Sequence, residues 1–217
     1  MSMTNRKSVS DTVAASGLIA IVRSKSSDFC TEAVEALGSA GCNVVEATLT
    51  TPGALELVSI VRTRLPHITM GIGSVLTVDQ VLAAVDAGAQ FVVTPILRTD
   101  VVKACNDADL PIVCGAFTPT EAQTAYEAGA DFVKLFPAET LGSKYIKALL
   151  APLPHLRVIP TGGVDLTTIP ELFGAGCVAV AAGSNLVTEA LLSSRDSNAI
   201  ADRAKAFVHA VAKARGA

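Results

Sequence analysis

The 217-residue chain has no tryptophan, only two tyrosines, and 17% charged residues, against about 25% in an average soluble protein. With a net charge of -3, it lacks the basic surface that binding to a nucleic-acid backbone requires. Apolar runs such as residues 178–182 are far shorter than the roughly 20 residues that span a bilayer. The first ten residues are polar and lack the apolar core of a secretory signal. We therefore expect a soluble, cytoplasmic protein without nucleic-acid or membrane partners.

The sequence also lacks the residue clusters that hold metals or form disulfide frameworks. Its five cysteines and three histidines are spread along the chain, with no C-x-x-C pair and no metal-ligand spacing. The cysteines are Cys30, Cys42, Cys105, Cys114 and Cys177, and the histidines are His67, His155 and His209. We expect buried free thiols, no metal site and no cofactor.

A small-residue turn recurs four times, at residues 40–42, 87–89, 128–130 and 175–177, each time as Ala-Gly followed by Cys or Ala. A helical pattern precedes each turn, and a β-branched run follows it. Glycine in this position caps a helix in the left-handed conformation that other residues avoid. The spacing of the four glycines is about twice the length of a strand-helix unit, so a second strand is expected inside each interval.

Short apolar runs between these turns complete a set of eight expected strands. The runs are Leu18–Arg23, Val44–Val45, Ile68–Gly73, Phe91–Val93, Ile112–Gly115, Phe132–Val133, Arg157–Pro160 and Val178–Val180. Helical patterns lie at Asp28–Ser39, Gly53–Arg64, Val78–Ala87, Thr99–Ala108, Pro119–Ala128, Gly142–Leu150, Thr167–Gly174 and Asn198–Arg215. Eight alternating units predict an α/β protein with a (β/α)₈ TIM barrel as a single domain over residues 1–217, and an extra helix near residues 9–16. An open doubly wound sheet is the alternative.

In all four repeats a strand follows the glycine at the same distance. Residues counted from these glycines therefore share a common phase and occupy equivalent positions on alternate strands. Several features recur after 88 residues, by internal duplication or by chance. Five residues after each repeated glycine come Glu46, Val93, Lys134 and Ala181. In a (β/α)₈ barrel, matching inward positions of alternate strands fill one layer. The phase therefore predicts a carboxylate and an amine in the same interior layer.

Glu46 and Lys134 both stand in otherwise apolar strands, so their pairing requires an explanation. A space-filling buried salt bridge is one reading, although such pairs stabilise proteins weakly. The functional reading is catalytic: a lysine amine attacks a carbonyl only when it is neutral, and desolvation can lower its pKa far enough. We expect the two groups to titrate as a coupled pair.

Two glycine-containing loops follow the seventh and eighth expected strands. The first holds Thr161, Gly162 and Gly163, and the second holds Gly183 and Ser184. Loops at these places often bind phosphate in barrel enzymes, through glycine amides and a short helix N-terminus. Ordinary tight turns are the alternative reading.

Arg23 ends the first expected strand, so it is expected at the same end of the barrel as the two glycine loops. There it could bind a substrate carboxylate through two parallel hydrogen bonds. Its alternative is an arginine paired with a local acid. Arg98 lies beyond a strand end and is the weaker candidate, expected to face solvent.

Taken together, these motifs resemble the class I aldolases that act on 2-keto-3-deoxy-6-phosphogluconate (KDPG) and 2-keto-4-hydroxyglutarate (KHG). The resemblance covers nearly the whole chain. It is carried by LIAIVR (18–23), VEATLTTP (45–52), GIGSVLT (71–77), VTP (93–95), FTPTE (117–121), VKLFPAE (133–139), PTGGV (160–164) and GSNLV (183–187).

The resemblance implies a lyase of the Entner-Doudoroff type that cleaves KDPG to pyruvate and glyceraldehyde 3-phosphate, with KHG as a further substrate. By this resemblance Lys134 forms the Schiff base, and Glu46 is the acid/base. The two glycine loops hold phosphate, the Ser74 hydroxyl contacts the pyruvyl group, and Pro95 and Phe136 line its pocket. Family members need no metal or cofactor and are typically trimers.

The sequence departs from the family pattern at one informative position. Many members carry an arginine where Thr50 stands, and that arginine binds the pyruvyl carboxylate. Other members resemble this chain in having Thr or Asn there and an arginine at the end of the first strand, which makes Arg23 the expected clamp. The alternative substrate is 2-keto-3-deoxy-6-phosphogalactonate, which has the galactonate configuration.

Two further readings use the same residues differently. A phosphosugar isomerase or epimerase would use Glu46 to abstract a proton, while Lys134 stabilised an enolate. A non-catalytic phosphosugar-binding protein would need only the two glycine loops. The buried amine favours an enzyme over a binding protein.

Overall fold

The computed structural model describes residues 6–216 and contains one eight-stranded parallel sheet. The strands are β1 (Leu18–Val22), β2 (Val44–Thr48), β3 (Thr69–Gly73), β4 (Phe91–Val93), β5 (Ile112–Ala116), β6 (Phe132–Leu135), β7 (Val158–Pro160) and β8 (Val180–Ala182). Their order in the sheet is β7-β6-β5-β4-β3-β2-β1-β8. A parallel bridge between Thr161 and Ala181 joins the two ends of the sheet. The expected (β/α)₈ barrel is confirmed, and the open doubly wound sheet is excluded.

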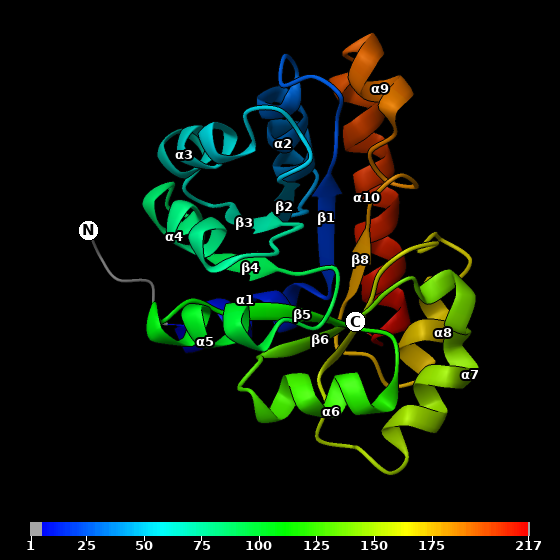
Figure 1. The fold of residues 1–217 in the computed structure, drawn as a ribbon. Helices are drawn as coiled ribbons and strands as arrows, with labels where there is room; N and C mark the ends of the chain where they lie inside the picture. The colour runs from blue at the N-terminus through cyan, green and yellow to red at the C-terminus, as the bar shows by residue number, and fades with distance from the viewer. Residues whose placement is uncertain (1–5, 217) are drawn as a thin grey trace.

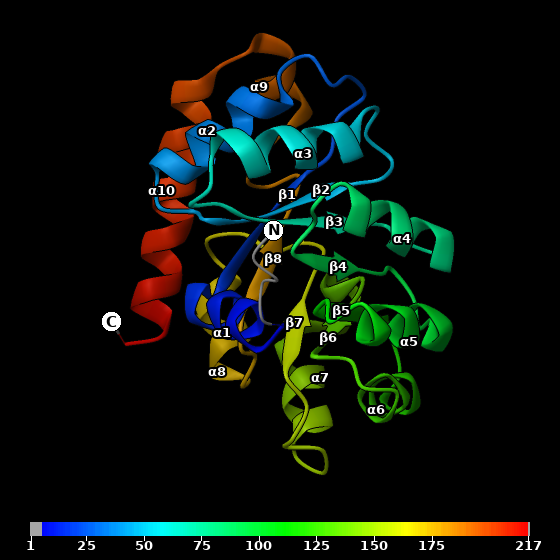
Figure 2. The ribbon, with the colours of Figure 1, turned by 90° about the vertical axis from the view of Figure 1, so that its left-hand side faces the viewer.

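Helices alternate with the strands and surround the barrel (Figures 1 and 2). Those that follow β1 to β7 are α2 (Cys30–Ser39), α3 (Ala54–Arg64), α4 (Val78–Asp86), α5 (Thr99–Asp107), α6 (Pro119–Glu127), α7 (Ala138–Leu150) and α8 (Ile169–Gly174). After β8 come α9 (Glu189–Ser194) and α10 (Ser197–Ala214). Within the described chain, no helix is long and apolar enough to cross a membrane.

The expected elements differ from the structure most at two boundaries and at one additional helix. The eighth strand was expected at Val178–Val180, but β8 spans Val180–Ala182, although the peptide N–H of Val178 already donates to the Val158 carbonyl of β7 at 3.0 Å. Helix α7 begins at Ala138 rather than Gly142, whose left-handed backbone kinks the helix. Helix α9 was not expected, since its six residues are too few for an apolar period to show.

The repeated glycines occupy the conformation that the sequence predicts. Gly41, Gly88, Gly129 and Gly176 have φ between +84° and +101°, and each follows the end of an even-numbered helix. The N–H of Cys42, just after the first of these glycines, donates to the Leu37 carbonyl at 3.0 Å. This backbone arrangement ends the helix and turns the chain into the next strand.

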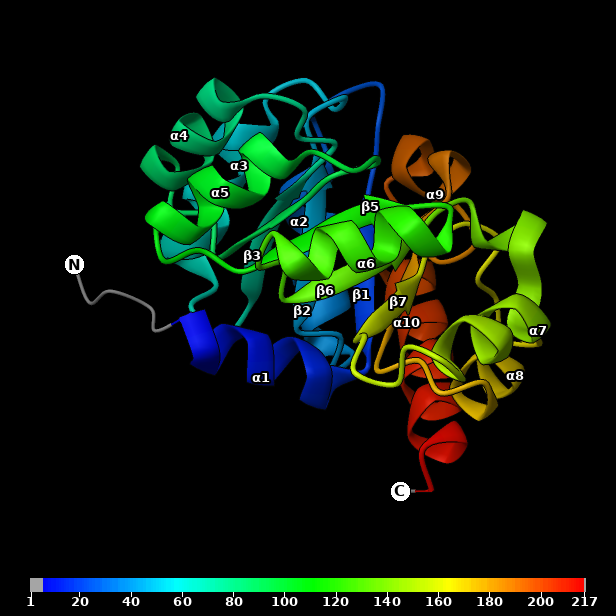
Figure 3. The ribbon, with the colours of Figure 1, turned by 60° about the horizontal axis from the view of Figure 1, so that its bottom comes forward.

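The barrel interior is apolar over most of its length and is closed at one end by α1 (Arg6–Ser16), which crosses below the strands (Figure 3). Val9 and Val13 of α1 pack with the interior side chains of the barrel. That interior cluster also contains Ile19, Ile21, Val44, Phe91, Val93, Val113, Phe132, Ile159, Ala179 and Ala181. The extra helix near residues 9–16 is confirmed and is longer than expected.

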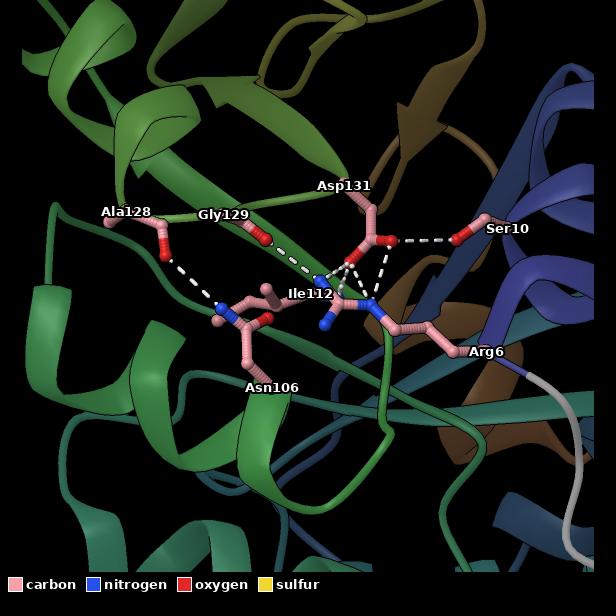
Figure 4. Close-up of polar contacts among 7 residues, drawn as sticks. All are labelled: Arg6, Ser10, Asn106, Ile112, Ala128, Gly129 and Asp131. Carbon is pink, nitrogen blue, oxygen red and sulfur yellow. Dashed lines mark hydrogen bonds and ion pairs between the residues drawn. The ribbon is translucent and has the colours of Figure 1, made fainter.

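A polar network ties α1 to the barrel wall (Figure 4). The Arg6 guanidinium donates to the Asp131 carboxylate from Nε at 3.0 Å and from Nη2 at 2.6 Å. The Asp131 carboxylate also accepts hydrogen bonds from the Ser10 hydroxyl at 3.0 Å and the Ile112 amide at 2.9 Å. One carboxylate thus connects α1, the start of β5 and the residue preceding β6.

Candidate active site

Glu46 on β2 and Lys134 on β6 both lie in the barrel interior. Glu46 is paired in register with Gly71 of β3 and is 1% exposed, and Lys134 is paired with Gly115 of β5 and is 6% exposed. Gly73 of β3 leaves room for the Glu46 side chain, since a methyl group at this position would overlap the Glu46 carboxylate. Val93 and Ala181 belong to the interior cluster, and Glu46 and Lys134 interact electrostatically, which agrees with the expectation that the four positions face the interior.

The protonation of the pair is governed by burial. Desolvation lowers the pKa of Lys134, and the charge of Arg23 lowers it further, while the Glu46 carboxylate acts in the opposite direction. Desolvation raises the pKa of Glu46 against the opposing charges of Lys134 and Arg23. The Glu46 Oε2 atom is buried without a hydrogen-bond partner. Both shifts favour the uncharged forms, which supplies a neutral amine to attack a carbonyl group.

A cavity of about 690 Å³ opens at the carboxyl ends of the strands, where barrel enzymes place their chemistry. Several predicted residues line it together: Arg23, Phe136, Thr161, Gly162, Gly163, Gly183 and Ser184. Lys134 and Glu46 are not among the lining residues, but the Lys134 Nζ atom lies 5.2 Å from the centroid of the Phe136 ring, which does line the cavity.

The two glycine loops expose backbone donors. Among the described residues, the amides of Gly162, Gly163 and Ser184 donate no hydrogen bond, and both glycines have positive φ. Thr161 is 5% exposed, and its buried hydroxyl has no partner. Free amides from two neighbouring loops form a concave site that suits an anion such as phosphate.

The two candidate arginines differ in their surroundings. Arg23 lines the cavity and makes no ion pair with any residue in the described range 6–216, so it remains available to an anionic ligand. Arg98 does not line the cavity. Its guanidinium forms a bidentate pair with Asp100, with the Nε–Oδ1 distance at 2.9 Å, and it is only partly exposed rather than fully solvent-facing. The reading of Arg23 as an arginine paired with a local acid is therefore wrong.

Ser74 and Pro95 follow β3 and β4 and do not line the large cavity. Ser74 has φ +64°, a left-handed conformation that costs energy for a residue other than glycine. Backbone atoms of Pro95 approach Gly115, the register partner of Lys134, so closely that no side chain would fit there. Pro95 follows β4, which is two strands from the β6 strand of Lys134, whereas Thr161 follows β7 on the other side of β6.

The structure adds residues that were not singled out from the sequence. Lys25, Asn185 and the carboxylates of Glu139 and Glu189 also line the cavity. Glu139 comes from the first turn of α7, and its side chain lies against Gly163. Glu139 belongs to the VKLFPAE segment, which carries the family resemblance, but no sequence spacing predicts that it contacts Gly163. Within the described chain, no cluster of three or more His, Cys, Asp or Glu could hold a metal.

A buried lysine of lowered pKa beside a buried carboxyl group, at the open end of a (β/α)₈ barrel, is the arrangement of a class I aldolase, a lyase that works through a Schiff base. A family model described as KDPG and KHG aldolase matches residues 9–203. The chain belongs to this family.

Individual relatives agree with that assignment. The chain is 34% identical over 180 residues to the 2-dehydro-3-deoxy-phosphogluconate aldolase of Haemophilus influenzae, covering 82% of this chain and 85% of that protein. It is 35% identical over 196 residues to the 2-dehydro-3-deoxy-6-phosphogalactonate aldolase of Escherichia coli K12, covering 89% and 96%. Its fold is similar to that of KDPG aldolase from Legionella pneumophila, solved with pyruvate captured as a covalent carbinolamine, with a TM-score of 0.84, 26% identity and coverage of 94% and 98%.

Proposed function

We propose that this enzyme cleaves 2-keto-3-deoxy-6-phosphogluconate to pyruvate and glyceraldehyde 3-phosphate. The observation that carries the proposal is the buried Lys134 amine of lowered pKa, placed next to a cavity that combines a free arginine with two amide-rich loops. The substrate has three matching features: a ketone for the amine, a carboxylate for the arginine and a phosphate for the amides.

The reaction begins when neutral Lys134 attacks the C2 ketone. Glu46, which its raised pKa keeps protonated at the start, gives its proton to the departing hydroxyl of the resulting carbinolamine. The carbinolamine thereby loses water and becomes an iminium ion that withdraws electrons from the neighbouring carbons, and Glu46 becomes a carboxylate. Glu46, directly or through one water, then removes the proton of the C4 hydroxyl. The C3–C4 bond breaks, C4 becomes the aldehyde carbon of glyceraldehyde 3-phosphate, and the bonding electrons form an enamine.

The second half of the reaction returns the enzyme to its starting state. Protonation of the enamine at C3 uses the proton that Glu46 has accepted and gives the iminium of pyruvate. Water then hydrolyses this iminium, which releases pyruvate and the free Lys134 amine. The iminium stabilises the developing charge that a metal ion would otherwise bind.

The remaining cavity residues bind and orient the substrate. Arg23 forms paired hydrogen bonds with the pyruvyl carboxylate and takes over the function of the arginine that many relatives carry where Thr50 stands. Phe136, which lines the cavity, borders the pyruvyl group, and contacts of Ser74 and Pro95 with that group stay predictions from the family resemblance. The amides of the two glycine loops bind the phosphate, and the unpartnered Thr161 hydroxyl faces a polar part of the substrate.

Arg23→Ala tests this assignment of the carboxylate clamp. Loss of a charge-assisted contact should raise the KM for pyruvate-forming substrates about 10- to 100-fold, as steady-state kinetics would measure. An unchanged KM would move the clamp elsewhere, with Lys25, the other basic residue that lines the cavity within the described chain, as the next candidate.

The phosphogalactonate isomer is a second candidate substrate, because the E. coli K12 relative of that name matches over 96% of its length. KHG, which yields pyruvate and glyoxylate, is a third. A coupled reductase that consumes pyruvate measures the rate of pyruvate release from each of the three compounds. Comparison of the three kcat/KM values then shows which substrate is preferred. The proposal expects the phosphogluconate isomer to be preferred, and a higher value for another compound would reassign the substrate.

The same measurement excludes or supports the other readings of the site. An isomerase or epimerase would convert phosphosugars without releasing pyruvate. A binding protein would hold the phosphorylated acids without turnover. Pyruvate release that depends on Lys134 is expected from the aldolase alone.

A homotrimer is proposed as the working assembly, and a cytoplasmic location stays a prediction. Exposed apolar side chains support the trimer, since consecutive loops after β3, β4 and β5 carry Leu76, Ile96 and Phe117 at the surface. Leu82 on α4 extends this apolar surface. Native mass spectrometry should give three times the chain mass, and a monomer at micromolar concentration would contradict the proposal.

A further inference from the structure

Three threonines at the end of β2 connect this strand to the loop that follows β1. The Thr48 hydroxyl lies 2.9 Å from that of Thr50 and 3.3 Å from that of Thr51. The peptide N–H of Ser24 donates to the Thr51 hydroxyl at 3.1 Å, across 27 residues of sequence. Thr48 and Thr51 are buried, at 0% and 2% exposure. This contact is thus shielded from water, which strengthens it and makes its loss costly.

The anchored loop carries the positive charge of the cavity. Arg23, Ser24 and Lys25 are consecutive and all line it, and the first and last are its only basic residues within the described chain. Glu139 and Glu189 line the same cavity, so its four charged side chains cancel. Attraction of an anionic substrate therefore depends on where the two cations are held rather than on a net positive charge.

The loop has few other attachments at this point. Within the described chain, Arg23 makes no ion pair and Lys25 has no hydrogen-bond partner. The Ser24 hydroxyl accepts the Ser26 N–H at 3.2 Å, and the Cys30 thiol at the start of α2 donates to the Ser26 carbonyl at 3.4 Å. These bonds join the loop to itself and to α2, but not to β2. Thr51 supplies the side-chain contact between this loop and its neighbouring strand.

We propose that Thr51 is a positioning residue that holds the Arg23–Lys25 loop over the cavity and thereby sets the affinity for the doubly anionic substrate. Thr51 acts through the loop and does not touch the substrate, since it does not line the cavity. The inference rests on the proposed function, because it takes the substrate to be an acid that Arg23 binds.

The experiment compares Thr51→Val with Thr51→Ser. Valine keeps the shape of the side chain but removes the acceptor for the Ser24 N–H, whereas serine keeps the acceptor. Thr51→Val should raise the KM for KDPG about tenfold while kcat changes less than twofold, and Thr51→Ser should stay within about twofold of wild type in both.

A matched control separates positioning from general stability. Thr77→Val removes the hydroxyl that caps α4 by accepting the Gln80 N–H, and Thr77 does not line the cavity. This variant should lower the melting temperature but leave KM unchanged. A KM for Thr51→Val equal to that of wild type, or a KM increase of the same size in Thr77→Val, would overturn the inference.

A pH profile adds a readout that a purely structural residue would not move. Arg23 lowers the pKa of Lys134, so displacement of Arg23 in Thr51→Val should shift the rising limb of pyruvate-adduct formation to higher pH. If the rate of adduct formation rises over the same pH range in Thr51→Val as in the wild type, the result counts against the inference. Wild-type protein that forms no pyruvate adduct at all would instead contradict the proposed function, so the two failures can be told apart.

Discussion

The proposed chemistry requires one amine to be neutral while a buried carboxyl group interacts with it electrostatically. Burial is the largest cause of the lowered pKa of Lys134, Arg23 lowers it further, and burial raises the pKa of Glu46 as well. The two residues were predicted because a shared strand phase placed them in one interior layer. Thr51 was not predicted, since nothing in a polar turn shows that its hydroxyl meets a peptide 27 residues away.

The pH dependence of adduct formation should report these charges. Because the pKa of Lys134 is lowered, the rate should rise with pH and level off below about 10.4, the ordinary lysine value. Glu46→Gln removes a carboxylate that raises the pKa of Lys134, so the rise of the rate with pH should move to lower pH. Arg23→Ala removes a cation that lowers this pKa, so the rise should move to higher pH. Stopped-flow measurements with pyruvate test the signs, and a rate that still climbs above pH 10 would contradict them.

The acid/base assignment of Glu46 has its own test. Glu46→Gln keeps the size of the side chain but cannot accept a proton, so kcat for cleavage should fall about 10²- to 10⁴-fold while the imine still forms. Steady-state kinetics and borohydride trapping of the same variant measure the two effects separately. Near-normal turnover would remove Glu46 from the mechanism.

Individual strands and helices show where sequence patterns suffice. Helix α6 begins at Pro119 as expected, because Thr118 and Glu121 form a capping box there. Strand boundaries agree to within one or two residues at most positions, since apolar runs end at glycine or proline. The kink at Gly142 and the short α9 were missed because neither leaves an apolar period.

The glycines of β3 and β5 should be intolerant of a side chain, for different reasons. A methyl group in Gly73→Ala would overlap the movable Glu46 carboxylate, so the fold should persist while kcat falls about 100-fold through misplacement of the acid/base. In Gly115→Ala the methyl group would meet backbone atoms of Pro95, and stability should fall as well. Melting curves and kcat for both variants check this contrast, and a Gly73→Ala enzyme with normal kcat would contradict it.

In the whole molecule, the cavity and the network that stabilises α1 lie at opposite ends of the barrel. The carboxyl end holds the cavity, and the opposite end is closed by α1 through the Asp131 network (Figure 4). The sequence predicted the barrel and the extra helix from the count of units. It could not predict the network, because Arg6 and Asp131 are 125 residues apart.

Loss of that network should destabilise the protein without altering its catalysis. Asp131→Ala removes the partner of a largely buried guanidinium and should lower the free energy of unfolding by about 1–3 kcal/mol, with KM unchanged. Lys103→Ala, which breaks an exposed pair with Asp107, is the matched control and should change it by less than about 1 kcal/mol. Urea denaturation measures both, and equal effects would argue against a stabilising function of the network.

The most direct measurement is the mass of the protein after borohydride reduction in the presence of pyruvate. A class I aldolase that uses Lys134 should gain one reduced pyruvyl group, and peptide mapping should locate it at Lys134. Lys134→Ala should remain folded and gain nothing. No adduct on the wild-type protein, or an adduct that persists in Lys134→Ala, would contradict the account.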